Sequence, residues 1–346
     1  MKREAMKRRS YVALAVIAAL AAGCGRPGGT QEERIEKVLA KKKDVTILVT
    51  DSGLGGLSVA ADVAARLTKS GVARKARVVF YNALFDNIGY NGLASEAEKD
   101  RIFDVVLRAM EERYRPDILL IACNTLSVVY DRTAFSRRSP FPVVGIVDTG
   151  VDLVAGEFEK TPGATAFLFG TKTTIENEAH KKALVARGLP AERIVGQACH
   201  RLAGAIERGV ATEETVGYIR QFVGEALAKT GPVSGPLFAA FVCTHYGYAR
   251  EQFAEAFAAA GYPGIALLDP NPLMADVLFR PAHLGRYPRT DVTVEVVSKL
   301  EITEQERASI GPLLEAVSPA VAAAFRSYTL DPKLFAVTFE KPPAKK

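Results

Sequence analysis

The sequence contains no tryptophan and only four cysteines among its 346 residues. Without tryptophan, the chain lacks the residue that best forms cation-binding aromatic cages and base-stacking platforms. The cysteines are Cys24, Cys123, Cys199 and Cys243, and none of them has the paired spacing of a zinc site. If Cys24 is modified, an odd number remains, which is a poor disulfide framework. We therefore expect no metal, and at least one cysteine that is present for its reactivity.

A large excess of charge of one sign is also missing from most of the chain. The formal net charge is +6 and the isoelectric point is near 9.0. Five basic residues, however, lie within the first nine positions, against the single acid Glu4, which leaves 40 basic and 38 acidic residues elsewhere. Binding of nucleic acid requires basic residues gathered on a folded domain, so we expect no nucleic-acid partner.

The first apolar run is too short to span a membrane as a mature helix. It covers residues 11–22 after the basic stretch, whereas a spanning helix needs about 20 residues. We assign residues 1–23 to a signal peptide. Its end, LAAGC at 20–24, resembles the bacterial lipobox, in which the cysteine becomes the lipidated first residue. We predict an exported protein, anchored to a membrane through Cys24 and facing the periplasm or cell exterior. Residues 24–43 are assigned to a tether or linker, in which the charged stretch 32–43 forms a surface helix or a linker. Ordinary signal-peptidase cleavage is the alternative.

Short apolar segments alternate with helical patterns along the rest of the chain, which indicates an α/β fold with largely parallel sheets. The predicted strands cover residues 45–50, 77–81, 117–122, 142–147, 164–169, 193–198, 237–242, 265–268 and 290–297. The clearest predicted helices cover residues 57–67, 96–113, 212–229 and 273–278.

Two buried strands, one in each half of the chain, run directly into a cysteine. Cys123 is followed by Asn124 and Thr125, and Cys243 is followed by Thr244 and His245. This weak internal repeat predicts two similar domains, which we assign to residues 44–147 plus 272–330 and to residues 148–271, with a tail at 331–346. In parallel sheets, ligands bind beyond the carboxyl ends of the strands. The two thiols are therefore expected on opposite sides of one cleft.

Two groups on opposite faces of a carbon centre are what an inversion of configuration requires, one to remove the proton and the other to return it. A thiol can serve if a helix N-terminus lowers its pKa. Asn124, Thr125 and Thr244 begin predicted helices, where backbone N–H groups can hold a carboxylate. Asp51 and His245 are placed to assist the two thiols.

Each of these features has a plainer interpretation. A single cysteine at the end of a buried strand is most often a small core residue. The glycines of residues 53–56 could form a phosphate loop, although the third glycine of the dinucleotide motif and the Walker lysine are both missing. Thr171 and Thr174 could cap a helix, and His245 could lie in a solvent-facing turn. The absence of G-x-S-x-G argues against a serine hydrolase.

Three segments together resemble glutamate racemase, of the aspartate/glutamate racemase superfamily. They are LVTDSGLGGLSV (48–59), ACNTLS (122–127) and VCTHY (242–246), in the order of the family's motifs, and weaker similarity covers residues 44–278. Gly89-Tyr90-Asn91 lies where the family has Pro-Tyr-Gly, and Glu207 lies where it has an acid that supports the second cysteine.

The resemblance implies two pseudo-symmetric three-layer domains with the active site in the interdomain cleft, no cofactor, and D- or L-glutamate as substrate. Family members are often homodimers. The implied catalytic residues are Cys123, Cys243, Asp51, His245 and Glu207. The implied substrate-binding residues are Ser52, Tyr90, Asn91, Asn124, Thr125, Thr171, Thr174 and Thr244.

Four departures from the family pattern leave other functions open. Leu126 replaces a small alanine, Gly89 and Asn91 alter the Pro-Tyr-Gly turn, Gly247 stands in place of proline, and the leader directs export. The alternatives are an aspartate racemase, a decarboxylase-like relative that needs one thiol, and an amino-acid binding lipoprotein without catalysis.

Overall fold

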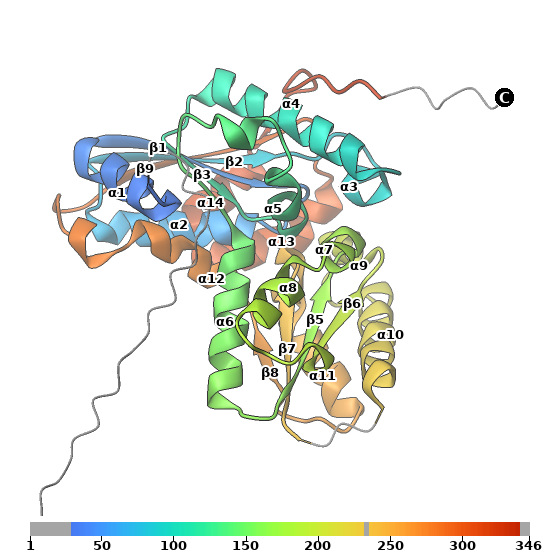
Figure 1. The fold of residues 1–346 in the computed structure, drawn as a ribbon. Coiled ribbons are helices and arrows are strands. Elements are labelled where there is room, and N and C mark those ends of the chain that lie inside the picture. Colours follow the sequence, from blue (N-terminus) through green and yellow to red (C-terminus); the bar gives the residue numbers. More distant parts are fainter. Residues whose placement is uncertain (1–28, 232–234, 340–346) are drawn as a thin grey trace, which may run out of the picture.

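The chain forms two α/β domains, each built on its own parallel sheet (Figure 1). The computed structural model describes residues 29–231 and 235–339, so the predicted signal peptide and Cys24 lie outside the described residues. The strands are β1 (Asp44–Asp51), β2 (Lys75–Asn82), β3 (Ile118–Ile121), β4 (Val143–Gly145), β5 (Thr165–Gly170), β6 (Ile194–Ala198), β7 (Leu237–Val242), β8 (Ala266–Leu268), β9 (Asp291–Ser298) and β10 (Thr329–Leu330).

Helices lie between most of these strands, and those expected at 57–67, 96–113 and 212–229 are present. The α-helices are α1 (Gln31–Lys41), α2 (Leu57–Ser70), α3 (Gly89–Gly92), α4 (Glu96–Tyr114), α5 (Asn124–Tyr130), α6 (Ile146–Lys160), α7 (Lys172–Asn177), α8 (Ala179–Ala186), α9 (Leu202–Arg208), α10 (Glu213–Thr230), α11 (Arg250–Ala259), α12 (Asn271–Met274), α13 (Glu304–Val317) and α14 (Pro319–Arg326). Short 3-10 segments include η3 (Thr244–Ala249) and η4 (Ala275–Leu278).

The first sheet has the strand order β10-β9-β2-β1-β3-β4, and the second has the order β6-β5-β7-β8. Every pairing in both sheets is parallel. The predicted α/β class with parallel sheets is therefore confirmed. The sheets contain the strands that the domain assignment gave to them, while its residue boundaries stay a prediction.

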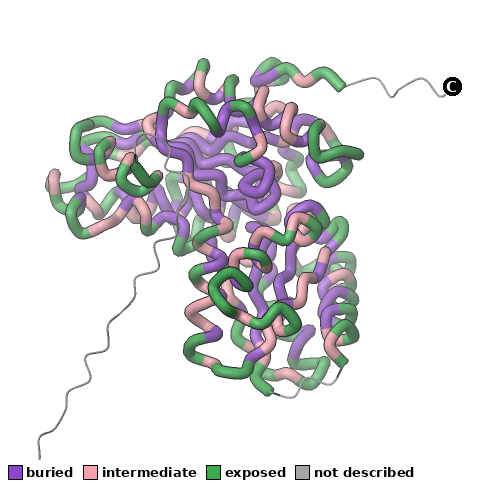
Figure 2. Tube along the Cα trace, viewed as in Figure 1, coloured by how far each residue is buried: buried purple, intermediate pink, exposed green. Residues whose placement is uncertain are grey.

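Both faces of each sheet are covered, which explains why the strands read as continuous apolar runs rather than alternating ones. In β1, Ile47 and Val49 pack on one face of the first sheet, and Leu48 packs on the other. The second sheet likewise separates two apolar clusters. In Figure 2 the buried chain follows the strands, and the exposed chain follows the outer helices and loops.

Two segments at the ends of the described chain pack on the first domain. The charged stretch at 32–43, expected as a surface helix or a linker, lies mostly in helix α1, whose Ile35 and Leu39 are buried in the first core. The first part of the predicted tail also packs, since Leu334 and Phe335 are buried and the Tyr81 hydroxyl donates to the Leu334 carbonyl at 3.3 Å. Both segments hold apolar residues that find room on the first domain, so neither is a free linker there.

Helices α13 and α14 were not predicted, and α13 also contacts the second domain. The Gln305 amide donates to the Arg208 carbonyl at 2.8 Å, and the Ser309 hydroxyl donates to the Ile206 carbonyl at 3.1 Å. The chain therefore crosses back to its first domain and then braces helix α9 of the second. No helix within 29–231 or 235–339 has the length and apolar character needed to cross a bilayer.

Candidate active site

The two cysteines that follow buried strands line one cavity of about 210 Å³ between the domains. Cys123 follows β3 and is the N-cap of α5, and Cys243 follows β7 and precedes η3. Each thiol residue is only 5% exposed. The lining residues are Asp51, Ser52, Gly53, Leu84, Asn87, Ile88, Gly89, Asn91, Cys123, Asn124, Thr125, Thr171, Ala203, Gly204, Glu207, Cys243, Thr244 and His245.

The first thiol lies beside the residues that end β1. Ser52 Oγ lies 3.2 Å from Cys123 Sγ. Burial raises the pKa of the Cys123 thiol, and the nearby Asp51 carboxylate raises it further. The predicted lowering of a thiol pKa by the helix N-terminus is therefore wrong for Cys123, because desolvation outweighs the N–H group of Leu126 that donates to Sγ.

Asp51 connects this first site to the second domain. Its Oδ2 accepts a hydrogen bond of 2.8 Å from the Thr244 hydroxyl, and its Oδ1 has no hydrogen-bond partner among the described residues. Burial raises the pKa of the Asp51 carboxyl, although the charge of His245 and the Thr244 hydrogen bond act in the opposite direction. An unpaired acceptor buried next to the cavity is suited to a donor group on a bound molecule.

The second thiol is supported by an imidazole and a carboxylate. His245 Nδ1 lies 3.7 Å from Cys243 Sγ, and His245 Nε2 lies 2.7 Å from Glu207 Oε1. Burial lowers the pKa of His245, but the Glu207 carboxylate and the Cys243 contact outweigh it and hold that pKa well above its ordinary value. Burial raises the pKa of Glu207, but His245 outweighs it and holds this pKa below the ordinary range. The Gly55 N–H also lies 3.1 Å from His245 Nε2, a contact that only a neutral ring can accept. The shorter Glu207 contact and the raised pKa of His245 favour an imidazolium–carboxylate pair beside Cys243.

The glycines of residues 53–56 allow the first domain to approach this pair closely. A Cβ on Gly55 would lie 2.3 Å from Thr244 Oγ1 and 2.6 Å from His245 Nδ1, and one on Gly53 would lie 2.7 Å from Glu207 Oε1. The Leu54 N–H also donates to Glu207 Oε1 at 2.6 Å. These glycines therefore serve close contact between domains, and the phosphate-loop interpretation is not needed to explain them.

Hydroxyl and amide groups gather on the other wall of the cavity. Thr125 Oγ1 lies 2.8 Å from Thr171 Oγ1, and Thr171 is the N-cap of α7. Neither polar atom of the Asn124 side chain, which is buried, has a hydrogen-bond partner among the described residues. Thr174 does not line the cavity, but its hydroxyl lies 3.0 Å from that of Thr171. Asn124, Thr125 and Thr171 are thus placed to meet a polar ligand.

The structure does not bring the Tyr90 side chain to this site. Tyr90 is 1% exposed and packs edge-to-face on Phe85 and Phe103, with ring centroids 5.0 and 6.1 Å away. Its ring is part of the apolar core between α4 and the first sheet. The expectation that its side chain contacts substrate is therefore not supported by its position.

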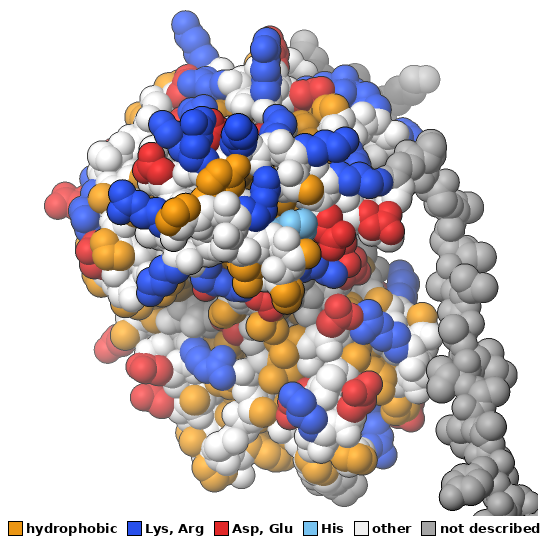
Figure 3. All heavy atoms as spheres, turned by 90° about the vertical axis from the view of Figure 1, so that its left-hand side faces the viewer, with side chains coloured by type: hydrophobic (Ala, Val, Ile, Leu, Met, Phe, Trp, Pro, Cys, Tyr) orange, Lys and Arg blue, Asp and Glu red, His pale blue; other side chains and the backbone are white. Residues whose placement is uncertain are grey.

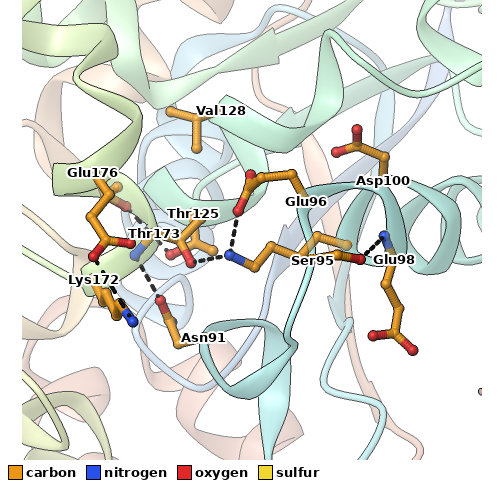
Figure 4. A network of polar contacts seen from close by, with 12 residues as sticks. Asn91, Ser95, Glu96, Glu98, Asp100, Thr125, Val128, Lys172, Thr173 and Glu176 are labelled. Carbon is orange, nitrogen blue, oxygen red and sulfur yellow. Dashed lines mark hydrogen bonds and ion pairs between the residues drawn. The ribbon is translucent and has the colours of Figure 1, made fainter. Parts of the chain in front are cut away.

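A polar bridge that the sequence did not predict joins the domains next to the cavity (Figure 4). The buried Lys99 ammonium of α4 donates to Thr173 Oγ1 of α7 at 2.9 Å and to Glu96 Oε1 at 2.5 Å. Asn91 Oδ1 accepts from the Thr173 N–H at 3.1 Å. We call Asn91, Lys99 and Thr173 the interdomain bridge. It holds helix α7, whose N-cap is Thr171, against the first domain.

Other possible ligand sites are larger but lack this chemistry. Surface grooves of about 810 and 1,050 Å³ contain neither Cys123 nor Cys243. Within the described ranges, no three His, Cys, Asp or Glu side chains are grouped to hold a metal ion. Cys199 is a free thiol buried in the core of the second domain, so its plainer interpretation as a core residue fits its position.

The site thus consists of two domains that each place one thiol in a small polar cavity between them. The family model of the Asp/Glu/Hydantoin racemases matches residues 47–271. This match covers well over half of the chain, which therefore belongs to the Asp/Glu/Hydantoin racemase family.

Two similar proteins are glutamate racemases. Glutamate racemase of Campylobacter jejuni is 31% identical over 147 residues, which are 40% of this chain and 52%, about half, of that protein. The enzyme of Lysinibacillus sphaericus is 25% identical over 248 residues, covering 68% of this chain and 86% of that protein.

Solved structures show the same fold. Glutamate racemase from Francisella tularensis, in complex with D-glutamate, has a TM-score of 0.60 at 19% identity and covers 79% of this chain and 95% of that one. The Bacillus anthracis enzyme has a TM-score of 0.56 at 20% identity, with coverage of 84% and 96%. The predicted α/β fold with largely parallel sheets is thus confirmed, and the structure divides it between two domains.

Proposed function

We propose that this protein racemises an acidic amino acid, glutamate before others, by passing the α-proton between Cys123 and Cys243 without a cofactor. The observation that carries the proposal is that the two thiols come from different domains and line the same cavity of about 210 Å³. That volume is below the 300–1,000 Å³ typical of drug-sized ligands and suits a single amino acid.

The two thiols are suited to different starting roles. Burial and Asp51 keep Cys123 protonated, so it is the acid that donates a proton to the α-carbon. The His245 imidazolium, 3.7 Å from Cys243 Sγ, stabilises negative charge on that sulfur, so Cys243 is the base. The Cys243 thiolate takes the α-proton to form S–H and leaves its electron pair on the α-carbon. Cys123 then gives its proton to the opposite face and becomes the thiolate, and the reverse reaction exchanges the roles.

The substrate carboxylate must be held while charge develops on the α-carbon. Asn124 and Thr125 open α5 and Thr171 caps α7, so their side chains and the backbone N–H groups of α5 face the cavity region. No lysine belongs to the described cavity lining, so its residues offer no amine for a Schiff base. The hydrogen-bond donors and the lysine-free lining both support a mechanism in which protein hydrogen bonds stabilise the carbanion.

Glutamate is proposed because the Campylobacter, Lysinibacillus and Francisella relatives are glutamate racemases. Aspartate is the second candidate, since Gly89 and Asn91, which stand where the family pattern has proline and glycine, both line the cavity. An amino-acid binding protein without turnover is disfavoured by the presence of both thiols with their supporting groups.

We further propose that the enzyme works outside the cytoplasm, as a lipoprotein anchored through Cys24. The support is the leader pattern of residues 1–24 in the sequence. Globomycin-sensitive processing and membrane partitioning of the full-length protein test this. A Cys24→Ala protein that is still processed and retained as before would contradict the lipid anchor.

Exchange of the α-hydrogen for deuterium from solvent tests the catalytic proposal. We expect exchange with D- and L-glutamate in the absence of pyridoxal phosphate, followed by NMR, and conversion of each enantiomer followed by circular dichroism. Cys123→Ser and Cys243→Ser should each abolish conversion, because one face then lacks its acid or base. Cys199→Ser is the matched control and should retain activity. No exchange across a panel of amino acids would exclude the racemase.

A further inference from the structure

Charge is unevenly distributed over the folded body, although its total is balanced. The described residues include 36 Lys and Arg against 37 Asp and Glu. One edge of the first domain is nevertheless rich in basic side chains, and we call it the basic edge. It consists of Lys41, Lys42, Lys43, Arg74, Lys75, Arg115, Arg286 and Arg289.

The topology explains why residues so far apart in sequence meet there. Parallel strands begin at the same edge of a sheet, and Lys75 is in register with Asp44 on one side and Asp291 on the other. Residues 41–43 lead into β1, and Arg115 precedes β3. The Arg286 guanidinium donates to the Ala40 carbonyl at 3.0 Å and to the Val72 carbonyl at 3.2 Å, which fixes the loop before β9 beside them.

Acidic neighbours neutralise only part of this edge. Asp44 pairs with Arg74, and Asp117 pairs with Lys42. Asp291 at the strand ends and Glu112, which lines a groove together with Lys42 and Arg115, are further acids. The basic residues on the edge that are exposed and form no ion pair with a described residue are Lys41, Lys43, Lys75, Arg115 and Arg289. A net positive surface therefore remains after internal pairing.

An apolar tip lies in the same loop. Leu284 is 46% exposed, and its loop is held to the end of α2 by the Gly285 N–H, which donates to the Ser70 carbonyl at 2.8 Å, and the Tyr287 N–H, which donates to the Gly71 carbonyl at 2.9 Å. Figure 3 shows this side of the molecule, where Lys and Arg side chains gather over the upper domain with scattered hydrophobic side chains among them. An apolar residue among cations is suited to the boundary of a charged bilayer.

We propose that the basic edge docks on an anionic phospholipid surface. Lys41 ends helix α1, whose 11 residues span about 16 Å and begin only seven positions after Cys24. A short link from Cys24 thus keeps this edge within reach of the bilayer that holds the anchor. The thiols lie at the opposite, carboxyl ends of the strands, so docking leaves the cavity facing away from the lipid.

This proposal extends the proposed location but does not require catalysis or lipidation to be tested. Residues 24–346 carrying Cys24→Ala keep every described residue and carry no lipid. We expect this protein to cosediment with vesicles of phosphatidylcholine and phosphatidylglycerol at low salt, and not with phosphatidylcholine alone. High salt should release it, because the attraction is screened.

Charge reversal provides the decisive comparison. The triple variant Lys41→Glu, Lys43→Glu, Lys75→Glu should lose roughly a hundredfold or more in partitioning, since each basic residue near an anionic surface contributes about fivefold. The matched control is Lys172→Glu, Lys181→Glu, Lys182→Glu on the second domain, which changes net charge equally and should retain binding. Deuterium exchange of glutamate should be unaffected by the basic-edge variant in solution.

Three results would overturn the proposal. The first is equal loss in the two triple variants, which would reduce the effect to net charge. The second is equal binding to neutral and anionic vesicles. The third is tighter binding to duplex DNA than to anionic vesicles, compared at equal phosphate concentration and equal salt, which would assign the edge to nucleic acid. Circular dichroism of each variant verifies that the fold is intact.

Discussion

Replacing Lys99 by methionine tests whether the interdomain bridge acts on the cavity. Methionine fills a similar volume but cannot donate a hydrogen bond. The Thr173 hydroxyl and the Glu96 carboxylate each lose a donor, although Glu96 keeps its ion pair of 2.6 Å with Arg132. The loss that remains uncompensated is therefore the contact between the domains.

The magnitude follows from the kind of hydrogen bond that is removed. A bond from a charged donor contributes roughly 1.5–3 kcal/mol, and the half-exposed Glu96 end recovers part of the loss through water. We therefore expect about 1–2 kcal/mol less stability for the closed arrangement of the domains. If substrate holds the cleft closed, KM rises about 5- to 30-fold and kcat changes little, because the contact exists before and during the reaction.

Lys172, which precedes Thr173 of the interdomain bridge, provides a matched control. Lys172 forms an exposed ion pair of 3.9 Å with Glu176 on α7, and such pairs contribute little (Figure 4). Steady-state kinetics of Lys172→Met should match the unmodified protein, and Lys99→Arg should recover part of the lost affinity. Equal KM values in Lys99→Met and Lys172→Met would refute a role of the bridge in substrate binding.

Three further changes test other parts of the site. Gly55→Ala should cost about 1–3 kcal/mol of stability and most of the activity, because its Cβ would overlap with the second domain. The control is Gly156→Ala in α6, where no atom lies within 4 Å of the added Cβ; it should keep its activity and gain up to about 1 kcal/mol of stability. Thermal unfolding and racemisation rates compare the two variants. Glu207→Gln should lower the pKa of His245, followed by NMR. In the unmodified protein, His245 stabilises the fold fully below pH 6.5, and this stabilisation is lost as pH rises through its raised pKa. Glu207 stabilises the fold fully above pH 4.5, and this stabilisation is lost as pH falls through its lowered pKa. The variant should therefore be less stable than the unmodified protein between the lowered pKa of Glu207 and the raised pKa of His245; an unchanged profile of melting temperature against pH would contradict the pair. Tyr90→Phe should leave KM unchanged and stability equal or higher, since the buried hydroxyl has no partner in the described part of the chain, and a large rise in KM would restore Tyr90 as a substrate contact.

The sequence predicts the parts of the site that follow from local pattern. A short apolar run ending in a polar motif defines both a parallel strand and the edge where it stops, which places Cys123 and Cys243 at strand ends. Asn124, Thr125 and Thr244 directly follow these cysteines, so their positions at the same edge are predicted as well. Agreement in this region arises because strand and motif are contiguous.

The residues that escaped prediction act through packing between distant segments. Lys99 lies on a charged stretch of α4 that reads as a solvent-facing surface, and only the position of α7 shows that its ammonium is buried. The raised pKa of Cys123 likewise depends on burial by the whole cleft, which overrides the local helix N-terminus. Tyr90 lies inside a recognisable motif, yet its ring turns to the core because apolar partners surround it there.

Each domain completes the chemical environment of the other one's thiol. Asp51 of the first domain is held by Thr244 of the second, and Glu207 of the second is held by the Leu54 N–H of the first. Neither half contains these contacts by itself, and burial of Cys123 is complete only when the two domains meet. Racemisation by two separately produced halves would therefore report on their reassembly.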